Sequence, residues 1–259
     1  KALLDGPVPE SAIVAVGVEQ LAKTAASLVR AGTKRILLEK PGGLNIQEIM
    51  SLSQVARERR AEIFLAYNRR FYESVLKVRE GIEQDGGLLS LQFEFTEWSH
   101  KIGPLVKAPG VKEQWVLGNS SHVIDLAFHL AGNPIDWKCW CAGSLDWHPS
   151  AARFAGSGVT DRGVIFSYLS DWQAPGRWGL ELLTAKKRYI LRPMENLQVT
   201  SIGSVSVDEV DLSDEFDVRF KPGLYRQTQA FLKGDDNWLC SLSDQVKHAT
   251  IYSEIAGYA

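Results

Sequence analysis

The sequence predicts an α/β protein in two parts: half of a doubly wound parallel sheet, then an α+β domain with a large, mostly antiparallel open sheet. Two patterns predict it. Through about residue 84, short aliphatic runs alternate with amphipathic helical segments, which is typical of parallel strands joined by crossover helices. After residue 85, single apolar residues alternate with polar ones, as in strands with one covered side. We therefore expect domains at residues 1–84 and 85–259.

The first part contains three predicted strands, at residues 12–16, 36–38 and 63–66, each a short aliphatic run. A helix between the last two is expected to begin at Asn45, which forms a capping-box pattern with Glu48. A complete doubly wound sheet normally has six strands, so these three correspond to half of one. The first strand is therefore expected to have an exposed edge.

The second part is expected to consist mainly of strands. Its strand candidates are residues 89–95, 136–145, 163–171, 177–184, 187–192, 196–201 and 205–210. Helical patterns occur at residues 119–131, 222–233 and 243–257, and the last helix could return to the first part. The glycine-containing segment 156–161 follows no buried strand and opens no apolar helix, so it is rejected as a phosphate-binding loop.

The open sheet is expected to keep apolar residues on both faces. Trp178, Leu180 and Leu182 alternate with Gly179, Glu181 and Leu183, so even the wetter face retains a leucine. Water tolerates such an exposed patch poorly, and we expect these sheets to pack together in a homodimer or homotetramer.

Composition excludes several classes of protein. The net charge of -2 gives no sign of the broad basic surface that binds nucleic acid or an anionic membrane. The sequence has no apolar run long enough to cross a bilayer and no signal-peptide pattern. Its three cysteines follow no metal-ligand spacing and indicate a reducing compartment, so the expected location is the cytoplasm. The first residue is Lys1, which suggests a trimmed or partial sequence.

Glu39, Lys40 and Pro41 directly follow the second predicted strand. This is the carboxyl end of the sheet, where open α/β folds bind their ligands. A lysine there can hydrogen-bond a substrate hydroxyl, and its charge eases deprotonation of that hydroxyl. Taken alone, however, the tripeptide is better explained as an ordinary surface loop.

If residues 119–131 form a helix, His122, Asp125 and His129 share one face of it. A histidine that titrates near neutral pH can accept a proton from a hydroxyl that is being oxidised, and a carboxylate can orient the histidine. Two other interpretations remain: a polar helix face with satisfied side chains, or a metal site built on two histidines and an aspartate. Without a further ligand pattern, we expect no metal.

Arg69 and Arg70 follow the third predicted strand. They could hold a carboxamide, carboxylate or phosphate, or they could pair with acids on a neighbouring helix. All eight tryptophans lie in the second part of the chain, and most are expected to be core or interface residues. Trp115 and Trp172 are the two that we expect to line a pocket.

Taken in order, these segments resemble the glucose-fructose oxidoreductase and inositol dehydrogenase family (Gfo/Idh/MocA). The motifs are Ala31-Gly32 at a helix end, Glu39-Lys40-Pro41, Asn68-Arg69-Arg70-Phe71, and His122-Val123-Ile124-Asp125. The predicted helix around residues 225–232 is also similar to a late helix of that family. The resemblance covers nearly the whole chain, and it implies a partial Rossmann domain followed by an open-sheet domain.

The resemblance also implies hydride transfer between NAD or NADP and a sugar, polyol or nucleotide sugar. In that case Lys40 binds and polarises the reacting hydroxyl, His122 is the acid/base, and Asp125 holds substrate or orients His122. The residues implied near the cofactor are Glu39, Lys40, Pro41 and Arg69. Those expected near the substrate are Tyr72, Trp115, Asn119, His129 and Trp172.

The chain departs from the family pattern in several places. It has no Gly-x-Gly-x-x-Gly turn and no ribose-reading acid, because Lys1 precedes what resembles the fourth Rossmann strand. We therefore expect weak dinucleotide binding by these 259 residues. Gly118 stands where many relatives have an aspartate, and residues 17–20 lack the usual polar pattern.

Two other functions stay open. One is a non-catalytic sugar-binding or assembly module built on the same scaffold. The other is a metal-dependent hydrolase or isomerase that uses His122, Asp125 and His129. Metal analysis of the protein distinguishes the metal-dependent hydrolase or isomerase from the other functions. Formation of reduced nicotinamide with a panel of sugars distinguishes an oxidoreductase from a non-catalytic module.

Overall fold

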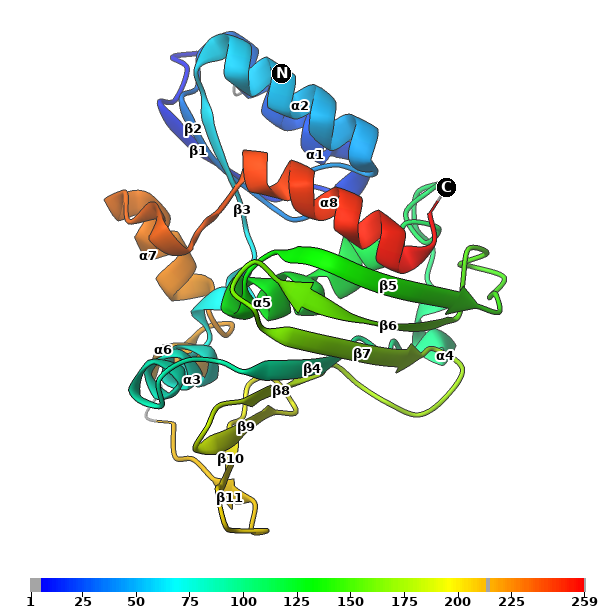
Figure 1. Ribbon diagram of the computed structural model, residues 1–259. Coiled ribbons are helices and arrows are strands. Elements are labelled where there is room, and N and C mark those ends of the chain that lie inside the picture. Colours follow the sequence, from blue (N-terminus) through cyan, green and yellow to red (C-terminus); the bar gives the residue numbers. More distant parts are fainter. Residues whose placement is uncertain (1–5, 213–214, 259) are drawn as a thin grey trace.

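The computed structural model describes residues 6–212 and 215–258. Two sheets lie one above the other, with helices between them (Figure 1). Within the described residues, the smaller sheet has the strand order β1-β2-β3-β12 and the larger sheet has the order β11-β10-β9-β8-β4-β7-β6-β5. The predicted fold class, a parallel α/β layer followed by a large and mostly antiparallel sheet, is confirmed.

The smaller sheet is built on three parallel strands. They are β1 (Ser11–Val14), β2 (Arg35–Leu38) and β3 (Glu62–Leu65). The connecting helices are α1 (Leu21–Ala31) and α2 (Ile46–Arg59). These elements lie within two residues of the predicted positions, because each carries a strong local hydrophobic pattern.

The start of α2 and the edge of β1 also follow the sequence. Asn45 Oδ1 accepts a hydrogen bond from the N–H of Glu48 at 3.0 Å, and the Glu48 carboxylate accepts one from the N–H of Leu44 at 2.8 Å. This arrangement satisfies N–H groups that a helix start leaves without partners. β1 lies at the edge of its sheet and pairs there with β2, and Ile13 on it is 54% exposed.

The sequence does not predict β12 (Cys240–Ser241), which pairs antiparallel with β3. Two residues are too few to show a strand period. β12 leads directly into α8 (Leu242–Ala256), so the last part of the chain returns to the first sheet.

The larger sheet contains the eight other strands of the described residues. They are β4 (Ser90–Glu94), β5 (Pro134–Ala142), β6 (Arg153–Thr160), β7 (Ile165–Asp171), β8 (Gly179–Leu183), β9 (Lys187–Leu191), β10 (Gln198–Ser201) and β11 (Asp208–Glu209). β4 and β7 pair in parallel, and the other recorded neighbours of this sheet are antiparallel.

β6 is the strand of the larger sheet that the sequence does not predict. Its central residues are Gly156, Ser157 and Gly158, which show no alternation of large apolar and polar side chains. The Tyr168 ring of β7 occupies the space that a Cβ on Gly156 would need. Glycine is therefore selected here by close packing, and its small size removes the periodic signal.

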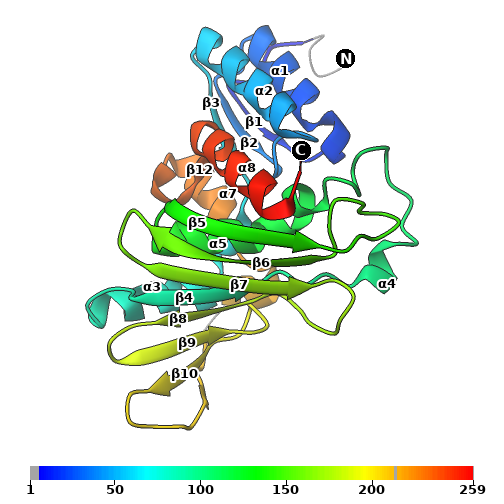
Figure 2. The same cartoon turned by 45° about the vertical axis from the view of Figure 1, so that its right-hand side comes forward.

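Two helices fill the space between the sheets (Figure 2). α5 (Ser121–Ala131) packs on β4, and α8 packs on α2, β3 and β5. The other helical elements are η2 (Val18–Gln20), η3 (Asn68–Phe71), α3 (Glu73–Gln84), α4 (Ser99–Ile102), the π-helical η4 (Val116–Ser120), α6 (Glu215–Arg219), α7 (Leu224–Lys233) and η5 (Asp236–Trp238). In the described part of the chain, no helix combines the length and the apolar character that crossing a membrane requires.

One face of the larger sheet carries an apolar patch formed by Trp140, Ile165 and Leu169, which are 62%, 63% and 70% exposed. The strand register places Trp140 and Leu169 in one row, on either side of Ala155. Leu183, which the sequence places on the wetter face, is half-buried. The patch supports the expectation that two copies of this sheet pack together.

We predict a homodimer that forms through this patch, and Leu169→Lys is expected to convert it to a monomer. A lysine ammonium buried in the contact loses its water without gaining a partner. Sedimentation equilibrium of both proteins measures the change. Met50→Lys on α2, at a residue that is 53% exposed, is the control and leaves the mass unchanged. A monomeric parent protein at micromolar concentration contradicts the prediction.

Candidate active site

The carboxyl ends of β1 and β2 open onto a cavity of about 280 Å³. One wall comes from residues 16–19 and 39–40, and the other comes from the segment 107–119. In open α/β sheets, ligands bind at this edge because the loops that follow parallel strands gather there. Glu39 and Lys40 both line the cavity.

Lys40 is half-buried, and its ammonium group donates a hydrogen bond to the backbone carbonyl of Gly118. Burial lowers the pKa of Lys40 to about 8. The carboxylates of Glu39 and Glu97 act in the opposite direction, while the charge of Arg69 adds to the lowering. Lys40 therefore keeps its proton at neutral pH but loses it more easily than an exposed lysine.

The residues on either side of Lys40 have different surroundings. Burial raises the pKa of Glu39, although the neighbouring Lys40 charge opposes that shift. The carbonyl of Pro41 accepts a hydrogen bond from Gln245 Nε2 of α8 at 3.0 Å. Pro41 thus fixes the loop to α8 and is not among the residues that line the cavity.

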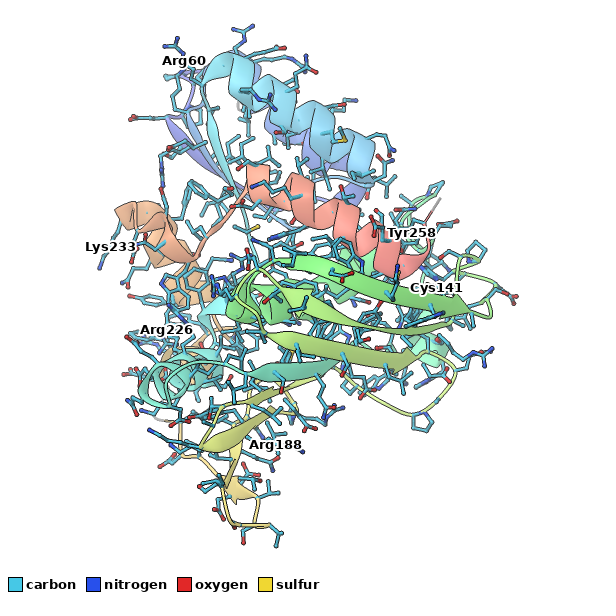
Figure 3. All side chains as sticks on the ribbon, viewed as in Figure 1. Arg60, Cys141, Arg188, Arg226, Lys233 and Tyr258 are labelled. Atoms are coloured by element: carbon cyan, nitrogen blue, oxygen red, sulfur yellow. The ribbon has the colours of Figure 1, made fainter. Side chains whose placement is uncertain are left out.

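Gly118, the partner of Lys40, lies in the π-helical turn η4 before α5. The N–H of Val116 donates to Tyr258 Oη at 3.0 Å, and Ser121 Oγ donates to the carbonyl of Leu117 at 2.7 Å. Tyr258 lies just beyond the end of α8 (Figure 3). A turn held from both sides can present a backbone carbonyl to Lys40, and π-helical turns occur frequently at functional sites.

His122 lies in the first turn of α5 and is 7% exposed. Its ring meets Tyr67 edge-on, with 5.7 Å between ring centroids, and lies 6.1 Å from Trp178. Burial lowers the pKa of His122 well below its usual value, and the charges of Lys40 and Arg69 lower it further. Nδ1 has no hydrogen-bond partner among the described residues. His122 is therefore neutral at pH 7 and can accept a proton.

Asp125 does not orient His122 in this structure. Its two carboxylate oxygens accept from Arg70, at 2.8 Å from Nε and 2.5 Å from Nη2. Within residues 6–212 and 215–258, no hydrogen bond joins Asp125 to His122. Arg70, in η3, also donates to the carbonyl of Trp238 at 3.3 Å. Asp125 therefore connects η3 to α5 and is not available to a substrate.

His129 likewise lies away from Lys40. Its ring packs on Trp238, with 5.4 Å between centroids, and it lines a separate cavity of about 830 Å³. α5 is buried on almost every side. Residues on the same face of this helix therefore contact different parts of the protein. The expected substrate contact at His129 is not supported by this placement.

The ligand set His122, Asp125 and His129 is not brought together. Among the described residues, the group whose ligand atoms lie within 4.8 Å of one another is Asp125, Cys240 and His248. Arg70 already occupies both oxygens of Asp125, and its positive charge opposes a cation at that point. The geometry thus weighs against the metal-dependent alternative.

Arg69 and Tyr72 lie on the side of the site that faces the larger sheet. The Arg69 guanidinium lies 4.6 Å from the Trp178 ring centroid and 5.9 Å from that of Tyr72. Burial lowers the pKa of Arg69, and its Nε has no hydrogen-bond partner among the described residues. Tyr72 is 3% exposed, which leaves it little surface for a substrate.

The two tryptophans have separate locations. Trp115 lines the Lys40 cavity together with Asn119. Trp172 is 1% exposed, donates from Nε1 to the carbonyl of Phe95 at 3.1 Å, and lines another cavity of about 510 Å³. Trp147 connects them, since its ring is stacked on Trp172 at 5.4 Å and meets Trp115 edge-on at 5.9 Å.

Glu97 is a candidate that the sequence analysis missed. It is 2% exposed, and its Oε1 accepts from Asn119 Nδ2 at 2.9 Å and from Ser120 Oγ at 2.8 Å. Burial raises the pKa of Glu97, although those two hydrogen bonds and the Arg177 charge lower it. The sequence contains a signal for this position, because Glu97 continues the inward-facing alternation of Leu91, Phe93 and Phe95. That alternation predicts a carboxylate on the core side of the sheet.

Solved structures with the same fold include three dehydrogenases. Levoglucosan dehydrogenase, in complex with NADH and levoglucosan, is similar over 98% of this chain and 79% of its own, with a TM-score of 0.74 at 18% identity. An inositol dehydrogenase homolog from Azotobacter vinelandii, in complex with NADH and myo-inositol, is similar over 95% of this chain and 75% of its own, with a TM-score of 0.72 at 13% identity. UDP-N-acetylglucosamine 3-dehydrogenase GnnA from Acidithiobacillus ferrooxidans is similar over 98% of this chain and 79% of its own, with a TM-score of 0.72 at 16% identity. At these identities the likeness establishes the fold.

Comparison of the sequence gives no corresponding match. No protein-family model matches the chain, and no curated protein matches it. The fold that the Gfo/Idh/MocA resemblance implies is therefore confirmed from the structure alone.

We predict that Asp125→Asn destabilises the chain by about 3–5 kcal/mol, because it leaves the Arg70 charge buried without its partner. The side chains of this pair are 6% and 1% exposed. Urea denaturation measures the change in the free energy of unfolding. Glu80→Gln, which breaks an exposed pair with Lys77, is the control and costs at most about 1 kcal/mol. Equal effects of the two substitutions exclude a structural role for the buried pair.

Proposed function

We propose that this chain is a nicotinamide-dependent oxidoreductase that transfers a hydride to or from a hydroxyl or carbonyl of a sugar, polyol or nucleotide sugar. The observation that carries the proposal is that Lys40 lines a cavity at the carboxyl ends of β1 and β2 and donates to Gly118, in the turn that leads into the buried His122 of α5. The two groups are close enough for the Lys40 charge to lower the pKa of His122. Known dehydrogenases of the same fold, in complex with NADH and a hydroxyl-rich ligand, support it.

The cavity beside Lys40 fits the nicotinamide end of NAD or NADP. Its lining combines apolar side chains such as Val16 and Val111 with a few polar groups, as cofactor sites usually do. Glu39 and Asn119 are the groups that could bind a carboxamide there, and Arg69 lies close to Lys40. When bound, the nicotinamide supplies the hydride acceptor or donor.

The residues of the chain would supply the proton chemistry. During oxidation, neutral His122 accepts the proton of the substrate hydroxyl, and in the reverse direction it returns that proton. Protonated Lys40 stabilises the negative charge that develops on the same oxygen. Burial strengthens this interaction, because water does not screen it.

This assignment predicts how the rate depends on pH. His122 is neutral from pH 6.5 upward, and Lys40 holds its proton below about pH 8. For oxidation of myo-inositol or levoglucosan, kcat/KM is therefore expected to be constant between these values and to fall as the pH rises above about 8. Following formation of reduced nicotinamide across this range measures the profile.

Lys40→Arg is the matched variant, since arginine stays protonated throughout this range. We expect a lower kcat/KM but no fall above pH 8. A parent profile that instead rises through pH 8 identifies neutral Lys40 as the base and overturns the assignment. Absence of reduced nicotinamide with every alcohol tested, at dinucleotide concentrations high enough to offset the weak binding expected from the sequence, favours a non-catalytic module.

A further inference from the structure

The turn that binds Lys40 is itself held by a side chain that follows α8. Tyr258 Oη accepts a hydrogen bond from the N–H of Val116, the first residue of η4, at 3.0 Å. Gly118, two residues later in the same turn, provides the carbonyl that accepts from Lys40. Among the described residues, this carbonyl is the acceptor recorded for the Lys40 ammonium group. The placement of Tyr258 therefore bears on the placement of that acceptor.

The sequence places Tyr258 through the glycine that ends α8. Gly257 has a φ of 66°, in the left-handed region that favours glycine. The N–H of Tyr258 donates to the carbonyl of Ser253 at 2.9 Å, and the N–H of Gly257 donates to that of Glu254 at 3.1 Å. This pair of bonds is a Schellman turn, which satisfies the last carbonyls of a helix and redirects the chain. A Cβ on Gly257 would lie 3.1 Å from Cys141 Sγ of β5, so glycine also lets this end of α8 approach the larger sheet (Figure 3).

The hydroxyl of Tyr258 is oriented by His148. His148 Nδ1 lies 2.7 Å from the carbonyl of Ala151, and Nε2 lies 3.0 Å from Tyr258 Oη. A carbonyl can only accept, so Nδ1 carries the proton of the neutral ring and Nε2 is the acceptor. Tyr258 then donates to His148 and accepts from Val116. Burial lowers the pKa of His148, although the Ala151 carbonyl and the Glu113 charge raise it, so the ring is neutral at pH 7.

His148 is a rigid point of attachment. It is 0% exposed, and its ring centroid lies 4.7 Å from that of Trp172. The backbones of Leu145 and His148 exchange hydrogen bonds of 3.1 and 2.9 Å. Ser150 Oγ lies 3.4 Å from each ring nitrogen, farther than the two partners described above. An unbroken series of hydrogen bonds thus leads from the second part of the chain through His148 and Tyr258 to η4.

We infer that Tyr258 and His148 are positioning residues for Lys40. They hold η4 through its first N–H, and η4 in turn keeps the carbonyl of Gly118 at the ammonium group. This inference rests on the proposed function, since it names what keeps the lysine of that site in place. In the described part of the chain, neither side chain is among those that line the Lys40 cavity, so both act through the turn and not on the substrate.

The proton of Lys40 depends on this carbonyl because burial works against the charged form. The charged side chains that act on Lys40 or line its cavity are Glu19, Glu39, Arg69, Glu97, Lys107 and Lys221. Of these, Glu39 and Glu97 raise the pKa of Lys40, whereas Arg69 and Lys221 lower it further. A hydrogen bond to the charged form of a group favours that form. If the carbonyl moves away while burial remains, Lys40 loses its proton at a lower pH.

The test compares Tyr258→Phe, which removes one hydroxyl and keeps the ring, with the parent chain. The pH dependence of Lys40 acetylation by trace acetic anhydride, followed by mass spectrometry of the Lys40 peptide, measures the pKa without any need for turnover. We expect a midpoint of about 8 in the parent chain and a midpoint about one pH unit lower in Tyr258→Phe. The fall of kcat/KM at alkaline pH is expected to move by the same amount.

Three further variants separate positioning from a general loss of stability. Tyr225→Phe removes a hydroxyl on α7 that accepts from Gln229 Nε2 at 3.4 Å, and it leaves the midpoint unchanged. His148→Leu removes the acceptor of the Tyr258 hydroxyl and lowers the midpoint as Tyr258→Phe does. His148→Gln keeps one acceptor and one donor, so its midpoint stays closer to that of the parent chain. Thermal unfolding shows which variants are folded at the assay temperature, and only those are compared.

The outcomes distinguish this inference from the proposed function. A lower midpoint in Tyr258→Phe, without reduced nicotinamide from the parent chain, supports the positioning of Lys40 and contradicts the oxidoreductase. Turnover by the parent chain, with the midpoint and the pH profile unchanged in Tyr258→Phe, keeps the oxidoreductase and overturns the positioning. A lower rate in Tyr258→Phe at an unchanged midpoint also overturns it, because loss of folded protein reduces a rate without moving a pKa. An equal shift in Tyr225→Phe overturns it as well.

Discussion

The buried ion pair between Arg70 and Asp125 is the contact on which the geometry of the site depends. Arg70 lies in η3, directly after β3, and Asp125 lies one turn after His122 in α5. Their side chains are 6% and 1% exposed, so neither charge can exchange its partner for water. The pair therefore holds the helix that carries His122 against the carboxyl end of the smaller sheet, where Lys40 lies.

Burial then determines the chemistry of the groups that this contact brings together. It is the leading cause of the lowered pKa values of Lys40 and His122 and of the raised pKa of Glu97. Burial thus keeps His122 neutral and makes the Lys40 proton easier to remove, and shifts of this kind concentrate at functional sites. Gly118 has no side chain, and the backbone carbonyl of this residue accepts the hydrogen bond from the ammonium group of Lys40.

Local periodicity was enough to predict the parallel strands, the helix cap at Asn45 and the place of Lys40 after β2. Contacts between distant segments could not be predicted in this way. Helical spacing suggested that Asp125 faces His122, but its carboxylate is bound by a residue 55 positions earlier. His129 is on the same helix and lines another cavity, because α5 is buried on nearly every side. Small residues in β6 removed the alternation that marks a strand.

The proton transfer assigned to His122 is tested by comparing the two histidines of α5 in one assay. Initial rates of nicotinamide reduction are measured with a neutral polyol for the parent chain, His122→Asn and His129→Asn. We expect kcat to fall about 100-fold or more in His122→Asn, which loses the proton acceptor, and to stay within two-fold in His129→Asn. Equal rates for the two variants, or no reduced nicotinamide from the parent chain, would contradict this assignment.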